Sequence, residues 1–386
     1  MMLTLIAFVA VLSILVFVHE FGHFWTAKKL GLIPEEFGFG FPPRAVGIYR
    51  DKDGRWRYVF GKKKINDAAD TIYSLNWIPI GGFVKLGEDD DPGDDPNHFN
   101  NRPIWQRTII LLAGVTMNIV LAAALFAFGF TIGLPQALDN LAPGAKVSDQ
   151  HIQIVEVLPG TPAEEAGIKV SDIIVSVDGN QFKKSDELIK YVDEHQGEEV
   201  VYVIKRGGEE IKKTVTPKVM AETGRGGIGI GIMEVGLVRY PVWRAVWEGL
   251  KTTAYLIGAI IIAFYKLIKS LLLGAGLTSS VSGPVGIAAM TGQMARMGLA
   301  YLIQFAALLS INLAIINALP FPALDGGRVL FLIIEKIKGR PVKKEVESTI
   351  HYIGFALLML LVLVVTFKDI GRYSQTWQAL WEKIKR

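Results

Sequence analysis

The N-terminal segment of this chain combines the hydrophobicity of a membrane span with a cluster of ionisable side chains. Residues 1–18 carry no charge, and the apolar pattern continues around His19-Glu20-Phe21-Gly22-His23 to Ala27. A stretch of this length is typical of a transmembrane helix, in which ionisable groups are costly and usually functional. His19 and His23 share one helix face at the spacing that chelates zinc, with the carboxylate of Glu20 beside them. The segment therefore predicts a zinc site within a membrane, where metal-activated water would hydrolyse something that also lies in the bilayer.

Composition agrees with a membrane protein and narrows the chemistry. Hydrophobic residues make up 51% of the 386 residues and come in blocks. The 41 basic and 37 acidic residues nearly cancel, so no nucleic-acid partner is indicated. The absence of cysteine excludes disulfides, thiolate zinc ligands and cysteine nucleophiles. A cleaved signal peptide is the alternative interpretation of the first segment, but that segment has no basic N-terminal region and no small-residue cleavage site.

The predicted fold is a polytopic α-helical membrane protein. Four blocks are apolar enough to predict transmembrane helices, namely residues 1–30, 104–135, 299–327 and 351–368. Residues 31–103 contain segments that predict β-strands, including a hairpin of residues 46–49 and 55–60, and an acidic linker at residues 88–95.

The remaining blocks are expected to lie outside the bilayer core. Residues 150–235 alternate predicted strands with one helix, which indicates an α+β domain. In residues 240–298 the apolar core, 252–265, is short and bounded by lysines, so an amphipathic helix on the membrane surface is favoured over a fifth crossing. Residues 369–386 predict an amphipathic tail that follows the last span.

The distribution of basic residues predicts the orientation. Basic clusters follow the first span, precede the second and follow the third, and all three face the cytoplasm if the N-terminus is outside and four helices cross. The α+β domain is then extracytoplasmic, and the zinc motif lies near the cytoplasmic face. A fifth crossing at residues 252–273 would reverse the third span.

Asp325 is the candidate for the third zinc ligand, because catalytic zinc usually takes three protein ligands. It follows Pro320 and Pro322, which break the third span, and precedes two glycines. Irregular backbone at membrane depth is tolerated only where protein or a water-filled cavity surrounds it. The alternative is a turn-forming Asp-Gly pair. The other histidines are isolated and are interpreted as surface or loop residues, namely His98, His151, His195 and His351.

The combined motifs resemble the site-2 protease family, most closely its regulator-of-sigma-E protease branch. The matching motifs are His19-Glu20-Phe21-Gly22-His23, Gly81-Gly82-Phe83-Val84-Lys85-Leu86, Ala113-Gly114-x-x-x-Asn118, Ser282-Gly283-Pro284-Val285-Gly286-Ile287 and Asn317-x-x-Pro320-x-Pro322-x-Leu324-Asp325-Gly326. The resemblance covers nearly the whole chain, and the first and last motifs together are highly specific.

This resemblance implies roles for individual residues. His19, His23 and Asp325 would bind Zn²⁺, Glu20 would be the catalytic carboxylate, and Asn317 would contact substrate. Residues 46–86 would form a membrane-reentrant β-element that pairs with unwound substrate. Either Gly81–Leu86, which includes Gly81, Gly82 and Phe83, or Val46–Tyr49 is expected to offer the free strand edge. The α+β domain would be a single PDZ domain that takes a C-terminal peptide, with its carboxylate-binding loop formed by Gly227, Ile228, Gly229 and Ile230.

The implied activity is a zinc-dependent endopeptidase in the bacterial inner membrane. Its partners would be the lipid bilayer and single-span membrane proteins such as anti-sigma factors or remnant signal peptides. Two alternatives stay open at this point. One is a non-catalytic PDZ scaffold, against which the presence of Glu20 argues. The other is a membrane zincin of another family with a glutamate ligand, although Glu335, Glu345 and Glu347 are expected in a basic loop.

Overall fold

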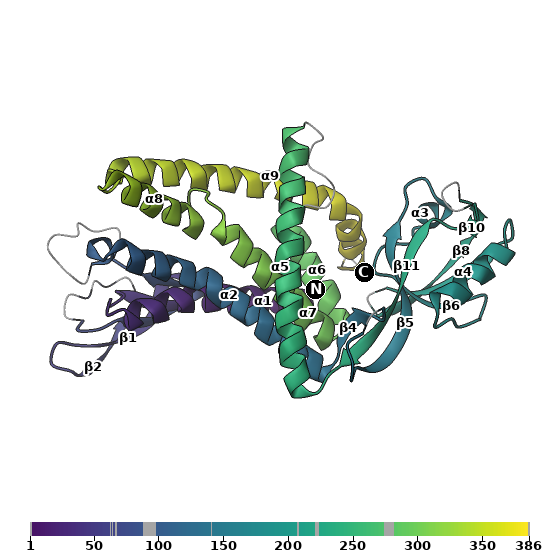
Figure 1. The fold of residues 1–386 in the computed structure, drawn as a ribbon, viewed down its shortest axis with the longest axis horizontal. Helices are drawn as coiled ribbons and strands as arrows, with labels where there is room; N and C mark the ends of the chain where they lie inside the picture. The colour runs from purple at the N-terminus through teal and green to yellow at the C-terminus, as the bar shows by residue number, and fades with distance from the viewer. Residues whose placement is uncertain are drawn as a thin grey trace. The chain divides into compact units, whose positions relative to one another are not determined.

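The fold comes from a computed structural model that describes residues 2–384 except 62, 64, 66, 67, 88–97, 140, 207, 221–223 and 274–281 (Figure 1). The predicted acidic linker lies outside these residues, as do the side chains of the predicted tail beyond Gly371. The chain forms two units, which we describe separately. The first unit contains residues 1–125, 251–292 and 305–386, and the second contains residues 126–250 and 293–304.

Long helices dominate the first unit because their sequences are almost uninterrupted runs of apolar residues. The α-helices outside the six-stranded domain described below are α1 (Met2–Lys29), α2 (Ile104–Ile132), α5 (Val242–Leu272), α6 (Pro284–Met297), α7 (Leu299–Ala318), α8 (Asp325–Lys338) and α9 (Lys344–Ile384). The short 3-10 helix η1 (Phe99–Asn101) precedes α2. Lysines in the last turn of α1 suit the negative end of its dipole, and α8 ends at Gly339 with a left-handed φ of 68°.

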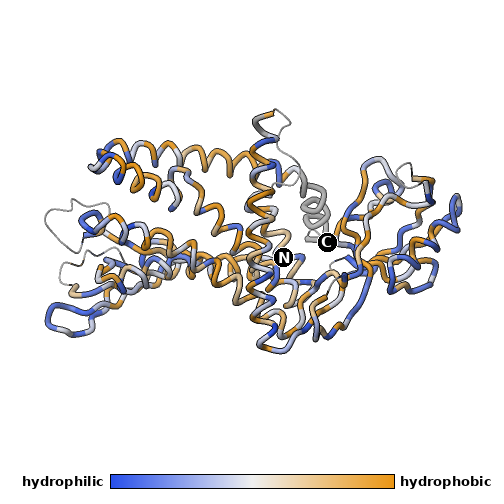
Figure 2. The backbone as a smooth tube through the Cα atoms, in the orientation of Figure 1, coloured by the Kyte–Doolittle hydropathy of each residue, from blue (hydrophilic) through white to orange (hydrophobic). Residues whose placement is uncertain are grey.

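Five helices of the described chain are long and apolar enough to cross a membrane, namely α1, α2, α5, α7 and α9. Apolar residues run along most of the length of these helices (Figure 2). The chain is therefore a polytopic membrane protein. Helix α5 is the one that the sequence analysis places on the membrane surface. It is the least apolar of the five, and only 6% of its most apolar stretch is buried within the protein.

A bent sheet of three strands follows α1. It consists of β1 (Glu36–Arg50), β2 (Trp56–Phe60) and β3 (Ile72–Lys85), in the order β2-β1-β3. The first half of β1 lies between the two halves of β3, because Phe37 pairs with both Tyr73 and Val84. The second half of β1 pairs with β2 from Val46–Phe60 to Arg50–Trp56, which is the predicted hairpin.

This register corrects one expectation about free strand edges. Val46, Gly47 and Ile48 pair with β2 on one side and with β3 on the other. The prediction that Val46–Tyr49 offers an edge to another strand is therefore wrong, because the bend of β1 places these residues inside the sheet. Residues Gly82–Lys85 pair with β1 on one side only, and no described strand pairs with their other side.

The motif at residues 282–287 begins α6 and is joined to α9 by a buried carboxylate. Asp369 accepts hydrogen bonds from the backbone N–H groups of Gly283 and Gly286, at 2.8 and 2.7 Å. Both glycines lie so close to α9 that a Cβ on either would stand about 3 Å from Asp369, at 3.1 and 2.9 Å. The glycines of this motif therefore allow α6 to start directly against α9.

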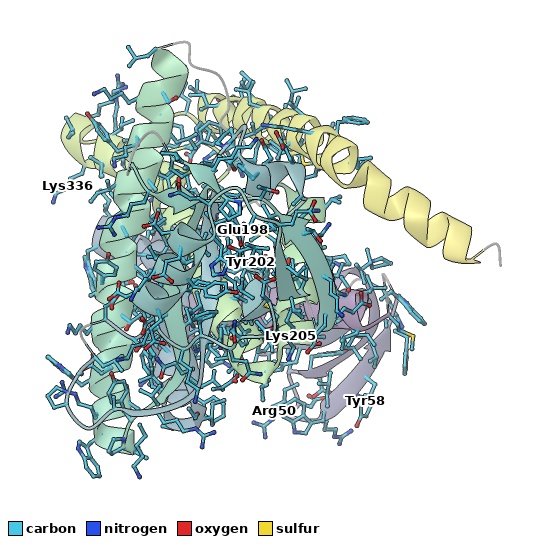
Figure 3. All side chains as sticks on the ribbon, turned by 90° about the vertical axis from the view of Figure 1, so that its right-hand side faces the viewer. Arg50, Tyr58, Glu198, Tyr202, Lys205 and Lys336 are labelled. Atoms are coloured by element: carbon cyan, nitrogen blue, oxygen red, sulfur yellow. The ribbon has the colours of Figure 1, made fainter. Side chains whose placement is uncertain are left out.

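The second unit contains a six-stranded domain. Its strands are β4 (Leu134–Ala137), β5 (Lys146–Val157), β6 (Ile173–Val177), β7 (Val200–Arg206), β8 (Glu209–Val215) and β11 (Ile230–Arg239). Their order is β4-β11-β5-β6-β7-β8, with helices α3 (Pro162–Glu165) and α4 (Ser185–Glu194) and a small ladder of β9 (Lys218–Val219) and β10 (Gly226–Gly227). Alternate residues of β7 face the core, where Tyr202 is almost fully buried (Figure 3).

The strand β4 joins the end of α2 to the six-stranded domain. Gly133, with φ of 111°, connects the end of α2 directly to β4, which pairs with β11. After β11, the N–H of Tyr240 donates to the carbonyl of Phe130 at 2.9 Å, and the two rings meet edge to face with centroids 5.6 Å apart. The domain thus begins before residue 150, the start expected from the sequence, and its strand β4 was not predicted.

Candidate metal centre

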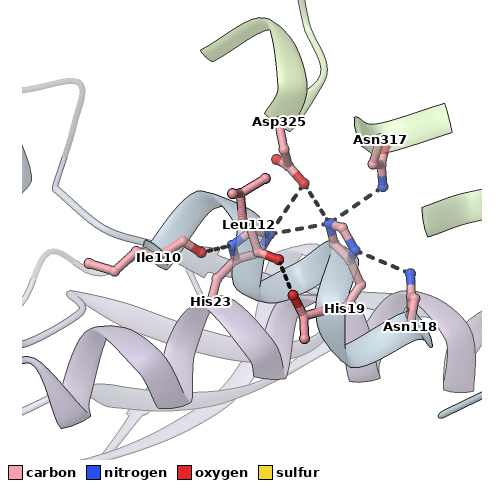
Figure 4. A network of polar contacts seen from close by, with 8 residues as sticks. His19, His23, Ile110, Leu112, Asn118, Asn317 and Asp325 are labelled. Carbon is pink, nitrogen blue, oxygen red and sulfur yellow. Dashed lines mark hydrogen bonds and ion pairs between the residues drawn. The ribbon is translucent and has the colours of Figure 1, made fainter. Parts of the chain in front are cut away.

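Three donor atoms from opposite ends of the chain converge between α1 and α8. The Nε2 atoms of His19 and His23 are 3.2 Å apart, and Oδ2 of Asp325 lies 3.0 Å from the first and 3.5 Å from the second (Figure 4). Zinc with ligands at about 2.0–2.1 Å in tetrahedral geometry holds its donor atoms about 3.3 Å apart. The three side chains therefore fit one zinc ion, and they are the one such cluster among the described residues.

The outer ring nitrogens of both histidines have polar partners. Nδ1 of His23 lies 2.8 Å from the carbonyl of Ile110, which selects the tautomer that leaves Nε2 free for a metal. Nδ1 of His19 lies 3.2 Å from the amide of Asn118, which is fully buried. The Oδ1 atom of that amide has no hydrogen-bond partner, so an amide turned by 180° would accept from Nδ1–H of His19. That orientation leaves both Nε2 lone pairs directed at the metal position.

Glycines let α1 and α2 approach each other at the donor atoms. A Cβ on Gly114 of α2 would stand 2.8 Å from Nε2 of His19 and closer still to Nε2 of His23. A Cβ on Gly22 of α1 would in turn stand 2.9 Å from the carbonyl carbon of Ala113. Gly114 and Asn118 belong to one of the motifs of the family resemblance but had no predicted role. The signal that could have indicated them is a glycine and an amide within an apolar span.

The catalytic candidate Glu20 lines a cavity of about 360 Å³ beside the donors. His23, Asp325 and Arg328 line the same cavity, and the second half of β3 contributes Val84 to its wall. The backbone N–H of Val84 is directed at the Glu20 carboxylate. A base, two of the three donors and an unpaired strand edge therefore border one polar space.

Asn317 and the glycines of β3 occupy different positions around this space. The amide of Asn317, in the last turn of α7, lies 3.4 Å from Nε2 of His19. Gly81 and Gly82 lie against α1, where a Cβ would stand 2.9 Å from Cβ of Val16 and 3.3 Å from the ring of Phe17. They thus place β3 beside the site, and Phe83 pairs with Gly38 of β1.

The predicted carboxylate-binding loop belongs to the second unit. Ile228 is buried, and its carbonyl accepts from the N–H of Ala163 at 3.0 Å. Gly229 has φ of 79°, and its carbonyl accepts from Leu158 at 2.9 Å. Gly227 ends β10 and Ile230 begins β11. The metal centre thus unites His19, Glu20, His23, Asn317 and Asp325, while residues 227–230 form a separate feature.

The glutamates weighed as alternative ligands lie elsewhere. Glu335 is on α8 rather than in a loop. Its carboxylate accepts two hydrogen bonds from the guanidinium of Arg107 of α2, at 3.1 and 2.5 Å. This ion pair is only 10% and 16% exposed. Glu345 and Glu347 lie in the first turn of α9. The expectation that these glutamates lie in a loop is wrong, because α8 continues through Glu335 to Lys338 and α9 already begins at Lys344. His351, interpreted above as an ordinary residue, contacts the segment before Asp325.

Comparison with known proteins agrees with this geometry. Residues 7–361 match the model of peptidase family M50. The zinc metalloprotease RasP of Geobacillus kaustophilus is 31% identical over 96% of this chain and 98% of its own length. The regulator of sigma-W protease RasP of Bacillus subtilis is 30% identical over 96% of this chain and 98% of its own.

A solved PDZ domain of an SdrC-like protein from Listeria monocytogenes is also similar. It covers 22% of this chain and 92% of its own, with 28% identity and a TM-score of 0.21. The family match extends over most of the chain and includes all three donor residues. The chain belongs to peptidase family M50 and is a zinc metalloprotease.

Proposed function

We propose that this zinc protease cleaves peptide bonds within or near transmembrane segments of single-span membrane proteins, with His19, His23 and Asp325 as the zinc ligands. The observation that carries the proposal is the meeting of three donors at tetrahedral spacing between helices that are otherwise apolar. Ionisable groups within membrane-spanning segments are rare and usually functional. When bound, zinc would polarise the scissile carbonyl and activate a water molecule.

Glu20 is the general base of this proposal. Its carboxylate borders the cavity together with His23 and Asp325, one residue along α1 from a ligand. From there it can take a proton from the attacking water and deliver it to the nitrogen of the leaving amine.

The unpaired edge of β3 is the proposed substrate-binding element. A peptide bond in a helix is hydrogen-bonded and shielded, so substrate must unwind before attack, and its freed N–H and C=O groups need partners in the bilayer. Gly82–Lys85 pair with β1 on one side only, and Val84 lines the cavity. A substrate strand added to this edge would place its backbone beside Glu20 and the metal. Asn317, next to His19, would contact the same segment.

The same geometry supports a proposed membrane topology. Asp325 follows α7, and His19 and His23 lie in the second half of α1, so α1 and α7 must cross in the same direction for these residues to meet. An odd number of crossings must then lie between α1 and α7. Helix α2 supplies one such crossing. A second crossing by α5 would start α7 on the wrong side of the membrane, so α5 does not span in this arrangement. We infer that α5 lies on the outer surface and that four helices span, with the N-terminus outside and the site near the cytoplasmic face.

The six-stranded domain is proposed to act as a PDZ domain for substrates. The loop Gly227–Ile230 precedes β11, and the first residues of β11 pair with β5 on one side only, leaving a strand edge for a peptide. The domain would bind the new C-terminus of a substrate already trimmed outside. The name of the Bacillus subtilis relative describes regulation of sigma-W, which makes anti-sigma factors the first candidates. Remnant signal peptides are the second class that we propose. The cell membrane of a bacterium is the expected location.

One variant separates the protease from a non-catalytic scaffold. Glu20→Gln should keep a full equivalent of zinc in detergent-purified protein, because the amide leaves the three ligands intact. It should lower cleavage of a model transmembrane peptide by about 10²–10⁴-fold, the usual contribution of a general base. Asp325→Ala should lose both zinc and cleavage. Wild-type cleavage by Glu20→Gln, or zinc retained without Asp325, would reject these assignments.

A further inference from the structure

The segment that delivers Asp325 has an unfavourable backbone conformation. Ala323, two residues before Asp325, has φ of 76°, in the left-handed region that side chains with a Cβ rarely adopt. The chain could relieve this conformation by rotating the peptide, and Asp325 would then start α8 from a different direction. Something must therefore hold the segment in place.

His351 of α9 makes the contact that holds it. Nδ1 of His351 accepts a hydrogen bond from the backbone N–H of Ala323 at 2.9 Å. The imidazole also packs against Phe331 of α8, with ring centroids 5.3 Å apart and an interplanar angle of 43°. The ring thus touches both the segment before Asp325 and the helix that Asp325 begins, and α8 and α9 lie side by side (Figure 1).

A glycine on the same face of α9 also packs against this segment. Gly354 follows His351 by three residues, so both face the same direction. A Cβ on Gly354 would stand 2.8 Å from the carbonyl oxygen of Pro322, so α9 touches the backbone of the segment directly. Gly327 packs as closely on the segment's other part, where a Cβ would stand 3.1 Å from the nitrogen of Pro322. The segment therefore has little room to move once His351 binds it.

We propose that His351 is a positioning residue for the metal centre: its Nδ1 holds Ala323 in the left-handed conformation that points Asp325 at the zinc position. This proposal rests on the proposed role of Asp325 as a ligand. His351 itself binds no metal in it, because Nδ1 is used by Ala323 and the ring does not reach the donor cluster formed by His19, His23 and Asp325. This role requires a hydrogen-bond acceptor at the position of Nδ1, and it does not require a charged side chain.

The first test compares two substitutions at this position by zinc retention. Oδ1 of an asparagine can occupy nearly the place of Nδ1, whereas leucine fills similar space without an acceptor. In detergent-purified full-length protein challenged with a chelator, His351→Leu should weaken zinc binding by about 10–100-fold, the effect of losing an outer-sphere partner of a metal site. His351→Asn should stay close to wild type. Tyr352→Leu is the matched control, since Tyr352 is 74% exposed on the same helix turn.

The second test asks whether the backbone of Ala323 transmits the effect. Glycine adopts positive φ without steric cost. Ala323→Gly should therefore leave zinc retention unchanged by itself and restore most of it when combined with His351→Leu. A histidine that only packs between α8 and α9 would gain nothing from a methyl group removed at Ala323. Rescue by glycine thus distinguishes the positioning role from general stabilisation.

The outcomes separate this proposal from the one it rests on. Zinc retained by Asp325→Ala in the same assay would overturn both. Zinc lost by Asp325→Ala but held normally by His351→Leu would overturn only the role of His351, as would equal loss in the leucine and asparagine variants without rescue. If His351→Leu does not accumulate, the asparagine variant and the double variant decide: zinc-loaded proteins support the proposal, and metal-free folded proteins reject it.

Discussion

A single methyl group at Gly114 is expected to empty the metal centre. The Cβ of an alanine there would stand 2.8 Å from Nε2 of His19 and closer to Nε2 of His23. Ordinary contact needs about 3.4 Å, so the His19 ring alone must move by roughly 0.6 Å, whereas metal–ligand distances tolerate only about 0.2 Å. The displacement exceeds that tolerance about threefold. A separation of the two helices would not be a simple relief, because it would break the close packing of Gly22 on Ala113.

Gly114→Ala should therefore bind zinc at least about 10-fold more weakly than wild type, and cleavage should fall in proportion. The assay is metal content of detergent-purified protein after graded chelator, with helicity measured on the same sample. Gly258→Ala is the matched control, because a Cβ on this glycine of α5 would meet no atom within 4 Å. Wild-type zinc affinity in Gly114→Ala would refute the close approach of α2 to the imidazoles. Equal loss in Gly258→Ala would show that any added methyl in these helices disturbs the protein.

Three further perturbations test other parts of the structure. Arg107→Glu should destabilise the protein by about 3 kcal/mol, because it leaves Glu335 buried beside a like charge. The reversed pair, Arg107→Glu with Glu335→Arg, should recover most of this loss in denaturant unfolding. A double variant that loses the sum of the two single-variant losses would contradict the pairing. Val84→Pro should lower cleavage at least several-fold while zinc content stays at one equivalent, since it removes an N–H that faces the cavity; unchanged cleavage counts against strand addition. Gly229→Ala should weaken binding of a C-terminal peptide, measured by calorimetry, without loss of zinc, because φ is 79° and a Cβ would strike Thr161; undiminished binding would place the peptide elsewhere.

The candidate metal centre could be predicted from local sequence, because each proposed ligand has a local signal. Two histidines four residues apart share a helix face whatever the rest of the fold does, and an apolar stretch around them sets their depth. Asp325 could be predicted because prolines and glycines in a span mark backbone that only a cavity tolerates. Membrane sidedness then placed it with the histidines, and the structure brings all three together. The predicted hairpin of β1 and β2 likewise follows from alternation and its Asp-Gly turn.

The parts that depend on distant packing could not be predicted. Val46–Tyr49 has the sequence of a strand, but only the bend of β1 shows that Val46, Gly47 and Ile48 are paired on both sides. Glu335 carries no local sign of its partner Arg107, and α5 satisfies the length and composition of a span although its role depends on the helices around it.

His351 is the clearest example of a contact that the sequence does not predict. In sequence it is a histidine 28 residues from Ala323, and no motif marks Ala323 as its partner. Its proposed role depends on α9 lying against the segment before Asp325. The sequence by itself determined which atoms can hold zinc, since those atoms belong to residue types at local spacings. The tertiary structure alone decided which side chains hold these atoms in place, since such contacts join segments whose separation along the chain says nothing about their distance in space.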